Sequence, residues 1–281
     1  MRRGSDGVLR LLYGAASGNR MSRTMGRVAD ARFPRHVLDR MIQTYCAVYR
    51  IDLSDYVIPE GGFRNFDDFF TRRVKAGVRP VDADRTVVAS PSDGRVQSVG
   101  TVERGMVLQA KGHEYALCDL IGDEALCAAF EGGPYITVYL SPRDYHRVHF
   151  PCDAEVTGCR YTPGRLFTVA PRATCVVDGL FVRNERISTL LRTKFGRAAL
   201  VMVGATGVGR ITTAYGDVVS NVGRRASGKA YDPAIAAKKG DELGTFHLGS
   251  TVVLVFEPGR WRVDAQVGEA VRMGQRLFRK V

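Results

Sequence analysis

The sequence predicts an α+β fold in which an N-terminal helical segment precedes a mainly antiparallel, barrel-like β-sandwich domain. In the first part of the chain, apolar residues recur at helical spacing. From Val87 onward, short apolar runs alternate with glycine and proline at the intervals of a sandwich or barrel. With 281 residues, of which 45% are hydrophobic, the chain is long enough to bury a full core.

Residues 36–50 are predicted to form an amphipathic helix whose polar face carries arginine. Pro59, Gly61 and Gly62 interrupt this pattern, so we divide the chain into a helical segment, 1–62, and a β-rich domain, 63–281. A short helix is expected within 66–73. The apolar positions of the longer helix are Val37, Leu38, Met41, Ile42, Tyr45, Val48 and Tyr49.

The predicted strands include VVAS, RVQSVG, MVLQA, YITVYL, AALVMVG and TVVLVF. Two similar stretches near the end, KKGDEL (238–243) and RMGQRL (272–277), each predict a turn that leads into a strand. Such a pair is found in compact carrier domains of the lipoyl and biotinyl type, and a generic turn signature explains it nearly as well.

The net charge of +12 and pI near 9.7 call for an anionic partner, which is nucleic acid, a membrane surface or an acidic substrate. Residues 1–50 carry ten arginines, three aspartates and no lysine or glutamate, a net charge of +7. The arginine-faced helix either lies in a lipid interface or packs on its own domain with a solvated outer face. Nucleic acid is disfavoured because no recognisable binding module accompanies the charge.

The cysteine pattern and hydropathy bear on the compartment. The six cysteines form no CxxC pair and are interpreted as reduced thiols of a cytosolic protein. No run approaches the ~20 apolar residues of a membrane span, and the start of the chain has too short an apolar stretch for a signal peptide. The chain is therefore expected to be soluble or to lie on a membrane.

The peptide bond between Gly249 and Ser250, at the start of an apolar strand, is a candidate for self-cleavage. Because Gly249 has no Cβ, the Ser250 hydroxyl can fold back onto the preceding carbonyl. The same letters also suit an ordinary tight turn.

Further reactive side chains lie in two motifs. Asp93, in SPSDGR, occupies a turn, and most Asp-Gly pairs are simply hairpin turns. His146 and His149, in YHRVH, have no evident third ligand and point to opposite faces of a strand, so no metal site is expected. His149 is a candidate base for Ser250, with His146 facing a substrate pocket, although either histidine alone also suits a structural role. The glycine-rich stretch VGATGVGRI lacks the G-K-[ST] ending of a phosphate-binding loop. It is interpreted as a glycine-rich β-turn or as backbone that lines a pocket.

Over about residues 63–258 the sequence resembles the phosphatidylserine decarboxylase family of pyruvoyl enzymes. The resemblance rests on seven motifs that occur in the same order with compatible spacing. Phe150 stands where that family often has methionine. The motifs are FFTRRVKAGVRPV, SPSDGRV, YLSPRDYHRVHFP, LFTV, NERI, VGATGVGRI and KKGDELGTFHLGSTVVLVF.

The resemblance implies roles for specific residues. Ser250 would become a covalent pyruvoyl group after cleavage of the Gly249–Ser250 bond, with Asp93 and His149 completing a triad for that step. His146 would handle the substrate or transfer a proton. The products would be chains 1–249 and 250–281.

The resemblance also implies the reaction and the partners. The expected reaction converts phosphatidylserine to phosphatidylethanolamine and CO2 at the cytoplasmic face of the cell membrane, where the protein is peripheral and the anionic lipid attracts the basic N-terminus. The two product chains are expected to stay together in a homodimer of cleaved protomers. The alternatives are a pyruvoyl decarboxylase for another headgroup lipid or a soluble amino acid, and a non-catalytic lipid-binding β-sandwich module.

Overall fold

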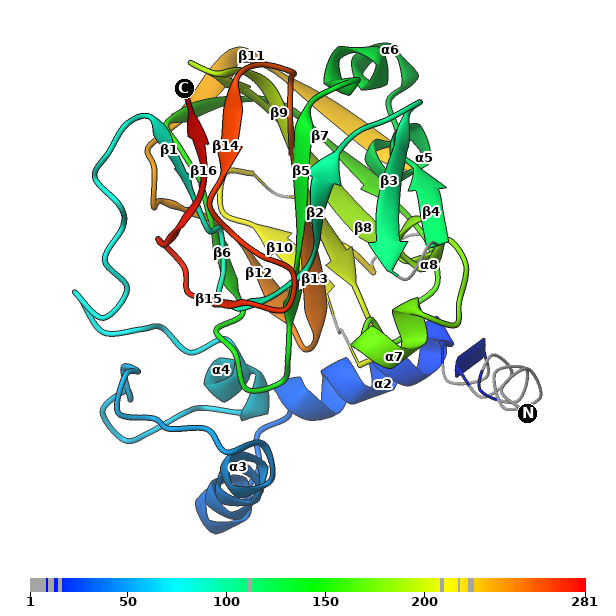
Figure 1. Cartoon of the computed structure of the whole chain (residues 1–281). Helices are drawn as coiled ribbons and strands as arrows, with labels where there is room; N and C mark the ends of the chain where they lie inside the picture. The colour runs from blue at the N-terminus through cyan, green and yellow to red at the C-terminus, as the bar shows by residue number, and fades with distance from the viewer. Residues whose placement is uncertain are drawn as a thin grey trace.

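The computed structural model describes residues 9, 13–14, 17–110, 113–207, 210–216, 218–221 and 225–281 (Figure 1). Arg2, Arg3 and Arg10 of the basic N-terminus lie outside the described residues, as do Val208 and Gly209 of the glycine-rich stretch. No described helix is long and apolar enough to cross a membrane.

Three of the described helices, α2, α3 and α4, precede the β structure and lie together below the ends of the strands in Figure 1. Helix α3 matches the predicted amphipathic helix, and α4 is capped at its N-terminus by Asn65, whose side chain accepts a hydrogen bond from the Asp68 amide. Shorter helices cover other parts of the sheets. The helices are α2 (Asn19–Asp30), α3 (Arg35–Tyr49), α4 (Phe66–Phe70), α5 (Leu117–Ile121), α6 (Glu124–Cys127), the 3₁₀ helix η1 (Ala128–Phe130), α7 (Pro171–Thr174) and α8 (Leu180–Arg183).

The strands form four antiparallel sheets. The largest has the order β11-β7-β8-β9-β13-β5-β2-β15, and the others are β10-β12-β6, β1-β16-β14 and β3-β4. The strands are β1 (Val87–Ala89), β2 (Gly94–Thr101), β3 (Met106–Ala110), β4 (His113–Ala116), β5 (Pro134–Leu140), β6 (Arg147–His149), β7 (Ala154–Thr162), β8 (Arg186–Thr193), β9 (Gly196–Gly204), β10 (Arg210–Thr213), β11 (Ser227–Ala237), β12 (Glu242–His247), β13 (Ser250–Phe256), β14 (Trp261–Val263), β15 (Ala270–Val271) and β16 (Arg276–Lys280).

Strand β13 lies in the middle of the large sheet, where β5 and β9 pair with it on either side. All seven of its residues are buried, which explains why TVVLVF is a continuous apolar run without polar alternation. A smaller core lies between α3 and α4, where Leu38, Ile42, Phe63 and Phe69 pack together.

The chain passes between the large sheet and a smaller one at several corners, three of which lie at the same end of the large sheet. The corner at residues 90–93 joins β1 to β2, the corner at 141–146 joins β5 to β6, and the corner at 248–249 joins β12 to β13. In the large sheet Arg95, Tyr139 and Thr251 form one row across β2, β5 and β13. The corners at 90–93, 141–146 and 248–249 therefore meet at one end of the sheet.

The repeated stretches 238–243 and 272–277 form equivalent turns. In one, the Asp241 amide donates to the Lys238 carbonyl at 3.0 Å, and in the other the Gln275 amide donates to the Arg272 carbonyl at 3.0 Å. Each turn exchanges two backbone hydrogen bonds with one residue of another segment, the first with Phe150 and the second with Ser90. The two similar stretches of sequence thus form a structural repeat. Their turns hold Phe150, which is next to His149, and Ser90, which is close to Asp93 in sequence.

The predicted α+β class, with N-terminal helices and mostly antiparallel strands, is confirmed. The described strands do not close into a barrel, so the barrel-like part of the prediction is not confirmed. The division at residue 62 stays a prediction. Asp93 and Gly94 do not form the hairpin turn that an Asp-Gly pair often indicates, because the strands on either side of them, β1 and β2, belong to different sheets.

Candidate active site

The Gly249–Ser250 bond follows a strained turn. Leu248 has φ 82° and Gly249 has φ 55°, so both residues adopt the left-handed region. Glycine takes this conformation without difficulty, whereas a leucine there costs on the order of 1–3 kcal/mol. The turn persists because it is held at both ends, by β12 in the three-stranded sheet and by β13 in the large sheet.

Ser250 is fully buried and is the first residue of β13, where it lies between Leu140 and Gly204 of the neighbouring strands. Its Oγ has no hydrogen-bond partner in the described part of the chain. A buried hydroxyl without a partner costs about 1–3 kcal/mol, and such atoms call for a functional explanation. The hydroxyl is therefore not committed to another group and is available to react with a neighbouring one.

An apolar cavity of about 420 Å³ reaches the Gly249 end of this turn. We call it the inner cavity. Its walls come from α2, α3, α4 and three loops, and none of the described residues that line it has a charged side chain. The residues that line it are Thr24, Met25, Val28, Ala29, Met41, Tyr45, Tyr49, Phe66, Phe70, Pro142, Thr206, Gly207, Leu248 and Gly249.

His149, the last residue of β6, is buried between two partners. Its Nδ1 lies 2.8 Å from the Gly240 carbonyl oxygen, and its Nε2 lies 3.0 Å from the Tyr145 hydroxyl. Burial lowers the pKa of His149, so the ring is neutral at neutral pH. Because a carbonyl only accepts, Nδ1 carries the proton and Nε2 accepts from Tyr145. Nε2 is thus the basic nitrogen.

His146 lies on the same corner but in a different environment. It is fully buried, its Nδ1 donates to the Asp144 carbonyl at 2.8 Å, and burial lowers its pKa to about 3. Its Nε2 has no hydrogen-bond partner in the described residues. The ring packs 4.2 Å from that of Phe70, a wall of the inner cavity. Phe70 therefore lies between His146 and the inner cavity. The sequence analysis had placed His146 facing the substrate pocket itself.

The two imidazoles bind different backbone carbonyls. Within the ranges that the structure describes, no group of three or more His, Cys, Asp or Glu side chains is placed to hold a metal ion. The six cysteines, all within those ranges, are free thiols.

Asp93 is buried, and its carboxylate is bound by Arg79. Nε of Arg79 lies 3.0 and 3.1 Å from the two oxygens and Nη2 lies 2.7 Å from Oδ2, while the Met273 amide donates to Oδ1 at 2.8 Å. Gly94 lets this corner approach β5, because a Cβ there would lie 2.5 Å from the Tyr139 carbonyl oxygen. Asp93 is held in place by these contacts.

The structure brings Asp93, His149 and Ser250 to the same end of the large sheet without joining them by hydrogen bonds. The His149 amide donates to the Pro91 carbonyl at 2.8 Å, two residues from Asp93. The carboxylate of Asp93 raises the pKa of His149, a smaller effect than the lowering by burial. One strand, β5, separates β2 from β13, which places their backbones about 10 Å apart.

Two residues that contact the predicted site were not assigned roles from the sequence. Arg79 holds Asp93, and Tyr145 holds His149; burial raises the pKa of Tyr145, so its hydroxyl keeps its proton and can donate. Both belong to motifs quoted above, Arg79 to FFTRRVKAGVRPV and Tyr145 to YHRVH. Neither motif carries a sequence signal for these contacts, since Arg79 lies 14 residues from Asp93.

Among the described residues the Ser250 hydroxyl has no partner, and it lies next to the glycine carbonyl of a strained turn and to an apolar cavity. With two neutral imidazoles nearby, this arrangement fits an enzyme that acts on a ligand with an apolar part. The comparisons with known proteins specify the class. A model of the phosphatidylserine decarboxylase family matches residues 66–279. The chain belongs to this family of carboxy-lyases.

Relatives named phosphatidylserine decarboxylase proenzyme match nearly the whole chain. The protein of Anaeromyxobacter sp. (strain K) is 44% identical over 265 residues, covering 92% of this chain and 93% of the relative. That of Bordetella petrii is 41% identical and covers 94% of both chains. That of Myxococcus xanthus is 41% identical and covers 92% of both.

Proposed function

We propose that this protein is made as a proenzyme, cleaves itself between Gly249 and Ser250, and converts phosphatidylserine to phosphatidylethanolamine and CO2 through a pyruvoyl group formed from Ser250. The observation that carries the proposal is the buried Ser250 hydroxyl, without a partner, directly after the strained turn. Membership of the family supports the reaction.

In the proposed maturation, Ser250 Oγ attacks the Gly249 carbonyl carbon, the C–N bond breaks, and an ester with a free Ser250 amine results. His149 takes the hydroxyl proton at Nε2, as the base of a serine triad does. For this step the Tyr145 hydroxyl must yield its place on Nε2, and the charge of Asp93 favours the imidazolium. Loss of the Ser250 Cα proton and the Gly249 carboxylate leaves dehydroalanine, whose hydrolysis consumes water and releases ammonia.

The pyruvoyl carbonyl would supply an electron sink for the carbon that loses CO2. The chain supplies the proton transfer. His146 Nε2, which has no other partner, would accept the proton that the substrate amine loses and return it to that carbon after CO2 departs. Positioned proton transfer of this kind contributes about 10²–10⁴ in rate.

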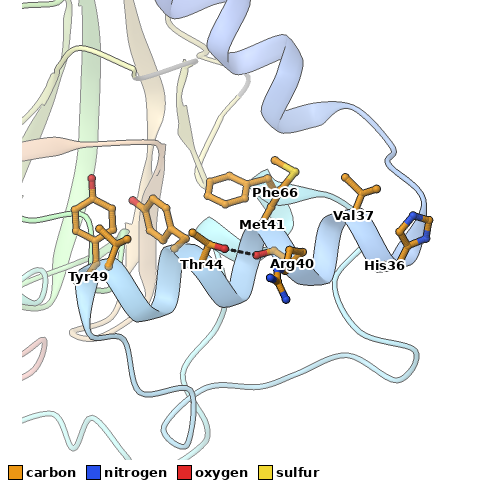
Figure 2. A pocket seen from close by; sticks show the side chains of 9 residues that line it. His36, Val37, Arg40, Met41, Thr44, Tyr49 and Phe66 are labelled. Atoms are coloured by element: carbon orange, nitrogen blue, oxygen red, sulfur yellow. Dashed lines mark hydrogen bonds between the residues drawn. The ribbon is translucent and has the colours of Figure 1, made fainter.

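The cavities suit a substrate with long apolar chains. A second cavity of about 820 Å³, the outer groove, runs along α3 and shares Met41, Tyr45, Tyr49 and Phe66 with the inner cavity. Figure 2 shows Val37, Met41 and Tyr49 on the side of α3 that faces α2. A continuous apolar surface thus leads from the outside of α3 to Gly249, which favours a lipid over a soluble amino acid.

We propose that residues 1–62 attach the protein to the cytoplasmic face of the membrane, that 63–281 form the catalytic domain, and that cleaved protomers dimerise. Helix α2 exposes Met21, Met25 and Val28, which are 42%, 44% and 47% exposed. It also exposes arginines 20, 23 and 27. Exposed apolar side chains among arginines suit an anionic lipid interface.

The proposed cleavage is tested by the mass of the purified protein under denaturing conditions. We expect a fragment of 32 residues, 250–281, whose N-terminus is blocked and reacts with carbonyl reagents. The companion chain should end at Gly249. A full-length chain as the sole species, under conditions that permit maturation, would rule out the pyruvoyl group.

Membrane attachment through α2 predicts that Met21→Glu weakens binding to vesicles containing phosphatidylserine. Burial of a methionine side chain is worth about 1.5–3 kcal/mol, so binding should fall by about tenfold or more. The matched control is Val281→Glu, since Val281 is 76% exposed and the C-terminus lies at the opposite end of the molecule from α2 (Figure 1). Equal sedimentation of the two variants with vesicles would place the contact elsewhere.

A further inference from the structure

The strained turn is anchored, on the side away from Ser250, by a hydrogen-bonded contact between a histidine and an aspartate. His247, the last residue of β12, lies with Nδ1 at 2.9 and 2.8 Å from the two carboxylate oxygens of Asp67. Asp67 belongs to the first turn of α4, which is 180 residues away in sequence. The contact therefore joins the helical part of the chain to the residue directly before Leu248.

This contact between His247 and Asp67 is well enclosed. The side chains of His247 and Asp67 are only 13% and 12% exposed. Nε2 of His247 lies 3.2 Å from the Thr212 hydroxyl. Arg210, which stands opposite His247 in the β10–β12 pairing, donates to Asp67 at 3.3 Å and to Asp30 of α2 at 2.7 Å. The end of β12 is thus fixed against α2, α4 and β10 together.

We propose that Asp67 and His247 are positioning residues for self-cleavage. A turn with a leucine at φ 82° relaxes if either end can move. At Ser250, β13 is paired on both sides. The pairing of β12 with β6 stops at Thr245 and His247 pairs only with β10, so the His247 end is the one that can shift. By fixing it, Asp67 keeps the Gly249 carbonyl beside the Ser250 hydroxyl. The inference rests on the proposed cleavage, and neither side chain touches the reacting atoms.

The test compares Asp67→Asn and His247→Ala with Asp68→Asn. Asp68 is the next residue of the same helix and pairs instead with Arg64 at the surface. Full-length chains are made by cell-free synthesis with a pulse of labelled methionine, and the fragment 250–281, which contains Met273, is followed over time. Asp67→Asn and His247→Ala should slow its appearance about 10- to 100-fold, because misplacement of reacting groups by an ångström has effects of this size. Asp68→Asn should match the unmodified chain.

Two further measurements separate positioning from general stability. His247→Lys, which again places a hydrogen-bond donor beside Asp67, should recover most of the cleavage rate. The Asp67→Asn/His247→Ala double variant should be no slower than the slower single variant, because the two changes remove the same contact. Hydroxylamine, which cleaves esters, should release no extra fragment from the slow variants, since they are slowed before the ester forms.

The outcomes distinguish the two proposals. If the unmodified chain never cleaves, the proposed function is wrong and this inference is wrong with it. If the unmodified chain cleaves and Asp67→Asn and His247→Ala cleave as fast as Asp68→Asn, only the positioning role is overturned. Multiplicative slowing in the double variant, or a rate that follows the thermal unfolding midpoint across all variants including His247→Lys, also overturns it.

Discussion

A Ser250→Ala protein is expected to remain a single chain of 281 residues and to release no CO2 from phosphatidylserine. Alanine lacks the oxygen that attacks the Gly249 carbonyl, and the electron sink that would arise from Ser250 cannot form. The loss should be complete rather than partial, because one missing atom removes both maturation and catalysis. Intact mass and release of labelled CO2 measure the two effects.

Thr251→Val is the matched control for this substitution. Thr251 is the next residue of β13, is fully buried, and its Oγ1 also lacks a hydrogen-bond partner among the described residues. The Thr251→Val protein should still cleave. Cleavage of Ser250→Ala at the same bond would show that the Ser250 hydroxyl is not the nucleophile. Loss of cleavage in both proteins would show that the effect of Ser250→Ala is not specific to that hydroxyl.

His146→Ala should cleave normally but decarboxylate about 10²–10⁴-fold more slowly, the usual contribution of a positioned proton donor or acceptor. His149→Ala should instead stay largely uncleaved, because its Nε2 is the proposed base of maturation. The contrast follows from their surroundings, since Nε2 of His146 has no partner and its ring packs on the cavity wall at Phe70, whereas His149 packs on Tyr145. Fragment yield and decarboxylation rate are measured on the same samples.

His113→Ala serves as the control for both histidines. His113 lies on β4 and pairs with Asp178, away from the three corners of the site. Both its cleavage and its activity should equal those of the unmodified protein. Full activity of cleaved His146→Ala would remove His146 from the proton transfer.

Much of the fold could be predicted because its signals are local. Helix α3 has apolar residues at three- and four-residue spacing, and the strands are short apolar runs bounded by glycine and proline. Helix α2 was not predicted, because arginines separate its apolar residues Met21, Met25 and Val28, which stay exposed. The residues that it buries are Ser22 and Ala29, which do not form an apolar stripe. The order of strands in the sheets likewise depends on pairings between residues far apart in sequence.

The candidate residues could be found from motifs, but their contacts could not. The letters of SPSDGR and YHRVH do not indicate that Arg79 binds Asp93 or that Tyr145 occupies Nε2 of His149. Both contacts depend on how three corners meet at one end of the large sheet. The positive φ of Leu248 is likewise invisible in sequence, since leucine rarely adopts it and the constraint comes from two different sheets.

The place of β13 between β9 and β5 determines what kind of molecule a chain cut before Ser250 becomes. The short product would supply the middle strand of the large sheet and, through β16, pair with β1 as well. The two polypeptides would then share one hydrophobic core, so neither could dissociate without unfolding the other. Heating would release them as separate molecules, and renaturation would become a second-order reaction whose yield falls on dilution.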